Sequence, residues 1–344
     1  MSEAALSEPA LTRGRAPWVQ RLASWDTAVI VLAVLALLIA SGAVHNFGTS
    51  RNFTFLLLDL LPVALVALPM TFVIVTGEID LSVASTLGLT SAVMGLLWDS
   101  GLSIETIMPL CVVLGAVLGA LNGFFVTVLK LPSLAVTIGT MALYRGLALV
   151  VLGDQAVAGF PRSYTSWVTG TVGGGVVPNL LIPLVVLALA FGLVLHATPV
   201  GRKVYAVGSS EQAARFAGIR VRQLKFWLYV VSGAVAGLAG VLWTLRYSSA
   251  RADNGFGIEL AVVAAVLLGG VSIFGGKGTL PGVLAGAVLL ATVQNALRLQ
   301  DVSSEALNIV TGALLIISVL LPNIVNSARA ALRRRRAVIQ EGKG

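Results

Sequence analysis

The stretch PVGRKVYAVGSSEQAARFAGIRVRQLK, residues 199–225, is the longest charged run that lies between two strongly apolar segments of the chain. It has one acidic residue, Glu211, and six basic residues: Arg202, Lys203, Arg215, Arg220, Arg222 and Lys225. Lys and Arg are retained on the cytoplasmic side when a membrane protein is inserted. This basic excess predicts a cytoplasmic loop, and we expect the apolar segments on both sides to cross the membrane.

A short helix is predicted inside this loop, over Ser210–Ala217. Ser209 is a suitable N-cap, Gln212 three residues later completes a capping box, and Gly218 favours the end of the helix. Two interpretations follow. The loop is a solvated connector that signals topology, or its helix docks in a groove of a soluble partner. The docking face would consist of small residues, namely Ala213, Ala214, Ala217 and Gly218.

The composition indicates an integral membrane protein. Of the 344 residues, 57% are hydrophobic and 11% are charged, whereas soluble domains have about 25% charged residues. The net charge of +8 comes mainly from the N-terminal arm, the central loop and the C-terminal tail. Each basic cluster flanks an apolar span, so membrane topology and attraction to anionic lipids explain the charge better than nucleic acid does.

A transmembrane helix needs about 20 apolar residues. By this measure the chain is an all-α, polytopic transmembrane bundle of about ten spans, with both termini, Lys130 and Lys277 in the cytoplasm. The spans are 27–44, 55–76, 81–98, 104–129, 133–152, 179–196, 226–245, 259–274, 279–297 and 303–321. The predicted domains are a cytoplasmic arm at 1–26, a transmembrane domain at 27–325 that includes the loop at 199–225, and a basic cytoplasmic tail at 326–344.

Small residues recur four positions apart in three segments, a spacing that lets helices approach closely. The rows are Gly115, Gly119 and Gly123; Gly233 and Gly237; Gly282 and Gly286. We interpret them as helix packing inside one subunit rather than as a dedicated dimerisation motif.

Two carboxylates, Glu78 and Asp80, lie between two predicted spans in the sequence TGEIDLS, residues 76–82. Charges inside a bilayer are costly and usually functional, so this segment would line the translocation path or support its gate. Alternatively, it emerges at the cytoplasmic surface, where Asp80 and Ser82 cap the next helix. Polar residues within the spans also suit a hydrated path. The candidate path or gate residues are Gly77, Glu78, Asp80, Ser82, Asn122 and Thr140.

The sequence contains no nucleophile elbow, no zinc-binding helix and no histidine–carboxylate set. The run GGVSIFGGKGT, residues 269–279, is not a Walker A loop, because Gly278 follows Lys277 where Ser or Thr is required. It is predicted to be a tight turn, and we expect no ATPase site and no enzyme activity in this chain. One cysteine, Cys111, and two histidines at span ends make a metal site or other cofactor unexpected.

Three stretches, taken in order, resemble one family: TFVIVTGEIDLSVASTLGL at 71–89, GRKVYAVGSSEQAARFAGI at 201–219 and ELAVVAAVLLGGVSIFGGKGTLPG at 259–282. They are similar to the permease subunit of bacterial ATP-binding cassette (ABC) importers for monosaccharides, the branch that includes the ribose permease. The resemblance covers residues 52–321. The family's usual first motif is Gly-Gly-Ile-Asp-Leu-Ser, so Glu78 adds a charge in place of the second glycine. The stretches at 66–80 and 249–255 are closer to rhamnose and autoinducer-2 type permeases.

The resemblance implies about ten spans in the arrangement of the vitamin B12-type (type II) importers, in the bacterial inner membrane. It implies a coupling helix between the sixth and seventh spans, held in a groove of a separate ABC ATPase subunit. An extracytoplasmic sugar-binding protein and a second permease subunit would be the other partners. Matched to this sequence, the coupling element comprises Gly201, Arg202, Ser209, Glu211, Ala213, Ala214 and Gly218.

The expected function is therefore alternating-access import of a monosaccharide, such as rhamnose or a related small sugar, powered by the ATPase subunit. One alternative is an ion- or proton-coupled secondary transporter in which Glu78 and Asp80 carry the proton. A second alternative is a membrane scaffold without transport activity.

Overall fold

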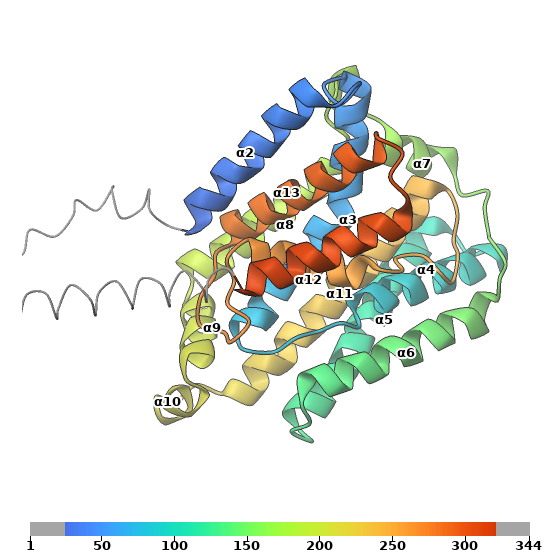
Figure 1. Ribbon diagram of the computed structural model, residues 1–344. Helices are drawn as coiled ribbons and strands as arrows, with labels where there is room; N and C mark the ends of the chain where they lie inside the picture. The colour runs from blue at the N-terminus through green and yellow to red at the C-terminus, as the bar shows by residue number, and fades with distance from the viewer. Residues whose placement is uncertain (1–24, 321–344) are drawn as a thin grey trace, which may run out of the picture.

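The computed structural model describes residues 25–320, and in this range the fold is built from helices, with two isolated β-bridges as its only β-structure (Figure 1). The predicted basic tail and nearly all of the predicted N-terminal arm lie outside the described residues. The longer helices are α2 (Trp25–Ala43), α3 (Ser50–Val75), α4 (Val83–Asp99), α5 (Ile104–Thr127), α6 (Ser133–Leu152), α8 (Leu181–Ala197), α11 (Val221–Tyr247) and α13 (Leu280–Arg298). The shorter helices are α7 (Arg162–Thr169), the 3₁₀ turn η1 (Val172–Gly174), α9 (Pro199–Ser209), α10 (Glu211–Phe216) and α12 (Ile258–Leu268).

Helix α3 runs through the middle of the bundle, and α2 lies on its outside (Figure 1). In an apolar stretch of 18 residues, 89% of α3 is buried inside the protein, whereas 17% of the corresponding stretch of α2 is buried. Pro62 and Pro69 lie inside α3. Proline is tolerated within a membrane helix because neighbouring helices can satisfy the backbone groups that it leaves free. The chain is therefore organised around α3.

Among residues 25–320, six helices are long and apolar enough to cross a membrane, or seven if the bent pair α8–α9 counts as one crossing. Three shorter apolar helices, α4, α12 and Ser304–Leu320, fall below that length. Each of the ten predicted spans overlaps one of these helices. A polytopic helical bundle is thereby confirmed, while helix length alone supports fewer than ten crossings.

The predicted glycine rows bring helices together inside the subunit. A Cβ atom on Gly115 of α5 would lie 2.2 Å from the carbonyl oxygen of Gly233 of α11, so only glycine fits there. On Gly286 of α13, a Cβ atom would lie 2.4 Å from the carbonyl oxygen of Ala265 of α12. These contacts agree with the prediction of close packing within one chain.

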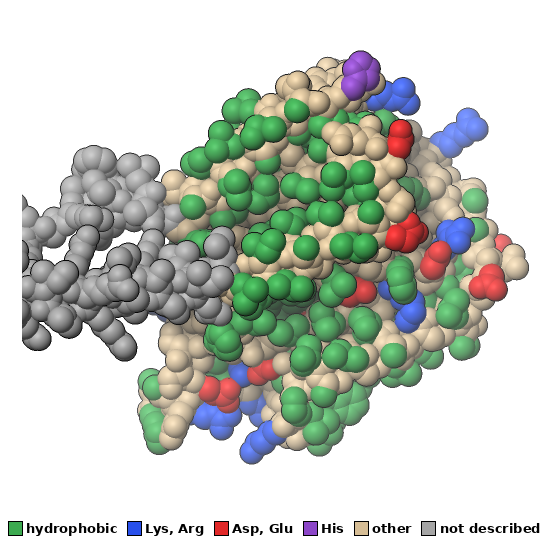
Figure 2. All heavy atoms as spheres, viewed as in Figure 1, with side chains coloured by type: hydrophobic (Ala, Val, Ile, Leu, Met, Phe, Trp, Pro, Cys, Tyr) green, Lys and Arg blue, Asp and Glu red, His purple; other side chains and the backbone are tan. Residues whose placement is uncertain are grey.

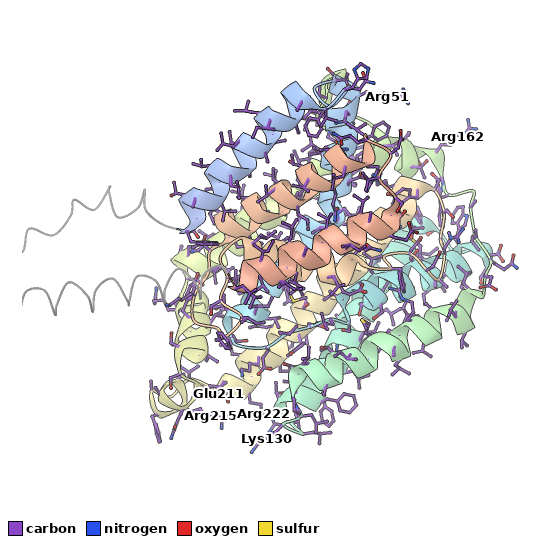
Figure 3. The ribbon with its side chains drawn as sticks, in the orientation of Figure 1. Arg51, Lys130, Arg162, Glu211, Arg215 and Arg222 are labelled. Carbon is purple, nitrogen blue, oxygen red and sulfur yellow. The ribbon has the colours of Figure 1, made fainter. Side chains whose placement is uncertain are left out.

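Charged side chains gather at the right and lower left edges of the molecule, with hydrophobic side chains between them (Figure 2). Arg51 and Arg162 lie toward one end, whereas Lys130, Glu211, Arg215 and Arg222 lie together at the other (Figure 3). This distribution suits a bilayer around the middle of the bundle. We call the end with Glu211 the basic end.

The opposite end has an ion-paired cluster that the sequence analysis did not identify. Asp59 of α3 pairs with Arg246 of α11 and accepts a hydrogen bond of 2.7 Å from Arg298 of α13. The Arg246 side chain is 9% exposed, so this charge is kept within the protein. The cluster joins three helices at the end that faces away from the basic loop.

Candidate functional site

The loop predicted at residues 199–225 begins with a helix that the sequence analysis missed. Helix α9 follows α8 after a bend of 67°. Thr198 accepts a hydrogen bond from the Val200 amide, and Pro199 occupies the first turn, where its missing N–H costs nothing. A Cβ atom on Gly201 would lie 1.8 Å from the carbonyl oxygen of Leu195. Gly201 therefore permits the bend, and the Thr-Pro pair is the signal that could have predicted α9.

The short predicted helix is present as α10, one residue shorter at each end than expected. Its N-cap is Ser210, whose hydroxyl accepts a hydrogen bond of 3.2 Å from the Ala213 amide. The prediction that Ser209 is the cap was wrong, because Ser209 is the last residue of α9. Gly218 ends this turn with φ of 82°, as predicted.

The outward face of α10 differs from the predicted one at Ala214, whereas Ala213, Ala217 and Gly218 are exposed. Ala214 is buried against Val207 of α9 and Val221 of α11, in a small apolar cluster that closes the loop. Ala214 cannot contact a partner, because its own neighbours cover it. Phe216 is 84% exposed, although it is the largest apolar side chain of α10. The other residues of the predicted element, Arg202, Ser209, Ala213 and Gly218, are exposed.

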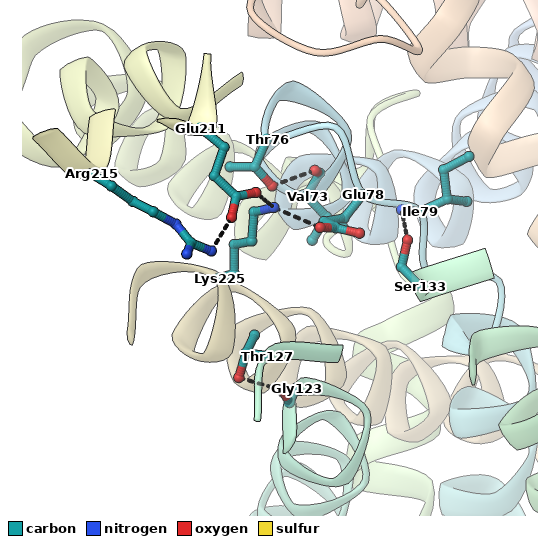
Figure 4. Close-up of polar contacts among 10 residues, drawn as sticks. All are labelled: Val73, Thr76, Glu78, Ile79, Gly123, Thr127, Ser133, Glu211, Arg215 and Lys225. Atoms are coloured by element: carbon teal, nitrogen blue, oxygen red, sulfur yellow. Dashed lines mark hydrogen bonds and ion pairs between the residues drawn. The ribbon is translucent and has the colours of Figure 1, made fainter. Parts of the chain in front are cut away.

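Lys225 links α10 to the segment that precedes α4 (Figure 4). Its ammonium group donates hydrogen bonds of 2.6 Å to Glu78 and 2.7 Å to Glu211, and Arg215 pairs with Glu211 one turn along α10. The hydrogen bond from Lys225 lowers the pKa of the Glu211 carboxyl group, and Arg215 acts in the same direction. Both carboxylates were predicted as site residues from the sequence, but Lys225 was not predicted as their common partner.

The segment between α3 and α4 is held by α6. Gly77 has φ of 81°, which lets the chain turn away from the end of α3. The Ile79 amide donates to the Ser133 hydroxyl at 3.3 Å, and the Thr137 hydroxyl donates to the Ile79 carbonyl at 3.2 Å. These bonds fix Glu78 at the basic end and direct the next residues into the bundle.

Asp80 is 1% exposed and belongs to a buried chain of polar groups. Its carboxylate accepts hydrogen bonds from the Ser82 amide at 3.1 Å, from the Ser82 hydroxyl at 2.7 Å and from the Ser232 hydroxyl at 3.2 Å. Asn122 donates to the Ser82 hydroxyl at 2.7 Å. Asp80 thus binds the amide of Ser82, the residue just before α4, whereas the Ser82 side chain makes no capping bond.

The structure divides the predicted path residues into separate groups. Asp80, Ser82 and Asn122 are brought together in the buried chain, to which the sequence analysis did not assign Ser232. Glu78 lies in the ion-paired cluster at the basic end and lines a cavity there. Thr140 is buried on α6 and bonds to the Thr137 carbonyl instead. Gly77 forms the turn between the groups.

The fold and the site define a polytopic helical membrane protein with an ion-paired helical loop at one end. The sequence profile of the family described as "Branched-chain amino acid transport system / permease component" matches residues 52–319, and this chain belongs to that family. The ribose import permease protein of Haemophilus influenzae is 35% identical over 270 residues, which cover 77% of this chain and 83% of the relative. The autoinducer 2 import system permease protein of Escherichia coli K12 is 33% identical over 302 residues, which cover 86% and 91%. No solved structure matches the chain.

The resemblance inferred from the three motifs is thereby confirmed: the chain is a permease subunit of the ABC importer family that includes the ribose permease. Such subunits are multi-pass proteins of the inner membrane and are not enzymes. Membership implies a separate ATPase subunit and a substrate-binding protein as partners.

Proposed function

We propose that this permease imports a monosaccharide, rhamnose or a related small sugar, across the inner membrane. Two relatives, at 35% and 33% identity, are named for the import of ribose and of autoinducer 2, which favours a small hydroxylated solute over a branched-chain amino acid. The motif stretches at 66–80 and 249–255 are the reason for choosing rhamnose within this class. The chain would act with a second permease subunit, identical or not.

The observation that carries the mechanism is the contact of Lys225 with both Glu211 and Glu78. In the proposed mechanism, the ATPase subunit holds the exposed side of α10 and moves it during the ATP cycle. Lys225 passes this motion to Glu78, and the short segment from Glu78 to Asp80 passes it to the start of α4. Arg202, Ser209, Ala213 and Gly218 are exposed for ATPase contact, while Gly201 and Ala214 maintain the shape of the loop.

The buried chain of Asp80, Ser82 and Asn122 is proposed to support the gate rather than to line an open path. Each polar group in it has a partner within the subunit, so a change in its bonds requires α4, α5 or α11 to move. In the proposed mechanism this group would have two arrangements, which the partners bias unequally. Gly77 and Thr140 would adjust the turn and the α6 wall beside it.

The proposed topology has ten crossings in a vitamin B12-importer-like arrangement, with the basic end in the cytoplasm. The arm at 1–26, the loop at 199–225 and the tail at 326–344 would then face the cytoplasm, and 27–325 would form the transmembrane domain. The excess of Lys and Arg at the end with α10 supports this orientation. The three helices too short to span alone would cross with local thinning of the bilayer or snorkelling of flanking side chains.

Proteoliposome uptake tests this function. The permease is reconstituted with its ATPase and binding protein, and uptake of labelled rhamnose, ribose and leucine is measured with ATP and a proton ionophore. We expect ATP-dependent sugar uptake that is insensitive to the ionophore. Uptake that needs the proton gradient but no ATP would instead support the secondary transporter that uses Glu78 and Asp80. A complex that moves no solute would support the scaffold.

A further inference from the structure

A cavity of about 590 Å³ opens at the basic end beside the ion-paired cluster. Its walls come from the end of α5, the turn before α6, α10 and the start of α11. This volume falls within the range of about 300–1,000 Å³ that is usual for ligand sites. The cavity is therefore large enough for a small charged group, and its charges decide which kind.

Five basic side chains and two carboxylates line this cavity. Both carboxylates are already paired, Glu78 with Lys225 and Glu211 with Lys225 and Arg215. Within residues 25–320, the other three cations, Lys130, Arg220 and Arg222, form no ion pair with a carboxylate. We call these three residues the unpaired basic cluster. Three uncompensated positive charges around one cavity favour an anion.

A second cavity of about 460 Å³ adjoins the first, and Thr127, Arg222 and Gln223 line both. Its remaining walls include Val128, Phe226 and Trp227. The Trp227 side chain is 61% exposed, and indole rings are favoured at the level of lipid headgroups. A charged cavity and an apolar groove that share a wall fit an amphiphile, with its headgroup in the first and an acyl chain along the second.

We propose that the unpaired basic cluster binds the phosphate of an anionic phospholipid from the cytoplasmic leaflet, with an acyl chain along Phe226 and Trp227. Basic pockets between helices on the cytoplasmic side are a known form of anionic lipid recognition. The choice of leaflet rests on the topology proposed above. Because the cavity is also lined by Arg215 and Lys225, the bound lipid would lie against the contacts that connect α10 to Glu78.

The test uses the full-length permease in nanodiscs and the fluorescence of its tryptophans. Phosphatidylglycerol or phosphatidylcholine with brominated acyl chains is included at the same mole fraction. We expect stronger quenching by the anionic lipid. That excess should disappear in Trp227→Phe, which identifies the reporting tryptophan among the six in the chain.

The triple variant Lys130→Gln, Arg220→Gln, Arg222→Gln should abolish the excess quenching, because it removes the charges and keeps the apolar side chains Phe226 and Trp227 of the second cavity. All three side chains are exposed, so we expect the fold to survive, and circular dichroism checks this. Arg162→Gln, an exposed arginine toward the opposite end, is the matched control and should leave the excess unchanged.

Three outcomes would overturn the proposal. The excess quenching could persist in the triple variant, or no excess could occur while inorganic phosphate binds the unmodified protein and not the triple variant, which would assign the cluster to a soluble anion. Alternatively, no excess could occur while the triple variant fails to retain the ATPase subunit, which would make the cluster a protein contact. The readout needs no transport, so the lipid site and the proposed import function can fail independently.

Discussion

The ammonium group of Lys225 lies 2.6 Å from a carboxylate oxygen of Glu78, although 147 residues separate them in the chain. Their side chains are 9% and 16% exposed, so water screens the pair only weakly. Lys225 also binds Glu211, and the three residues connect the loop helix α10 with the segment that enters the bundle at Asp80.

Replacing Lys225 by Met should lower the free energy of unfolding, because two partly buried carboxylates lose their shared cation. Breaking a buried ion pair at one partner typically costs about 3–5 kcal/mol, and the partial exposure of Glu211 places this site at or below the lower limit. Thermal unfolding in detergent measures the effect. Lys203→Met, on the exposed side of α9, is the control and should unfold like the unmodified protein. Glu78→Gln combined with Lys225→Met should recover part of the loss.

Acidification should weaken the same site. The pKa of Glu211 in the folded protein is lowered from its ordinary value of 4.5, chiefly by the hydrogen bond from Lys225. Its stabilising contribution is therefore present above that ordinary value and is lost as the pH falls through the lowered pKa. Between about pH 6 and about pH 3, the Tm of the unmodified protein should fall further than that of Glu211→Gln. Equal decreases in Tm would contradict the pairing.

Two variants on α10 separate loop structure from docking. Ala214→Trp should lose about 1–3 kcal/mol of stability by overpacking the cluster with Val207 and Val221. Phe216→Ala should keep the Tm, because that side chain is 84% exposed, but it should weaken co-purification of the ATPase subunit. If Phe216→Ala binds the ATPase as the unmodified protein does, α10 does not dock through Phe216.

Close packing of α5 against α11 should make Gly115→Ala destabilising, because the added Cβ atom would lie 2.2 Å from the carbonyl oxygen of Gly233. Gly139→Ala on α6 is the matched control, since nothing lies within 4 Å of its Cβ position. The Tm of Gly139→Ala should equal or exceed that of the unmodified protein, because alanine favours a helix by about 1 kcal/mol over glycine. A lower Tm for Gly139→Ala than for Gly115→Ala would refute the packing assignment.

The sequence predicted the helical segments and the small-residue packing because these depend on local patterns of apolar and small residues. It predicted the loop helix but misplaced the cap by one residue, from Ser210 to Ser209. The docking face was predicted from the small residues of this helix, so Ala214 was assigned to a partner and Phe216 was overlooked, whereas tertiary packing buries Ala214 against Val207 and Val221. The pairing of Glu78 with Lys225 could not be predicted, because no local pattern joins residues so far apart.

The same limit applies to the buried chain around Asp80. Asp80, Ser82 and Asn122 were recognised as polar positions near spans, but the sequence does not show that Ser232 meets them from α11. The sequence also allowed two locations for the segment at 76–82, along the translocation path or at the cytoplasmic surface. In the structure the two carboxylates lie in different places, because Glu78 lies at the basic end and Asp80 lies inside the bundle.

The most direct test of the account is the amount of sugar taken up per ATP hydrolysed by reconstituted complexes that contain Lys225→Met. If Lys225 passes the motion of α10 to Glu78, ATP hydrolysis should continue while uptake per ATP falls about tenfold or more, a typical size for a coupling between sites. The Lys203→Met complex should keep the ratio of the unmodified protein. An unchanged ratio in Lys225→Met complexes that assemble and hydrolyse ATP would contradict the account.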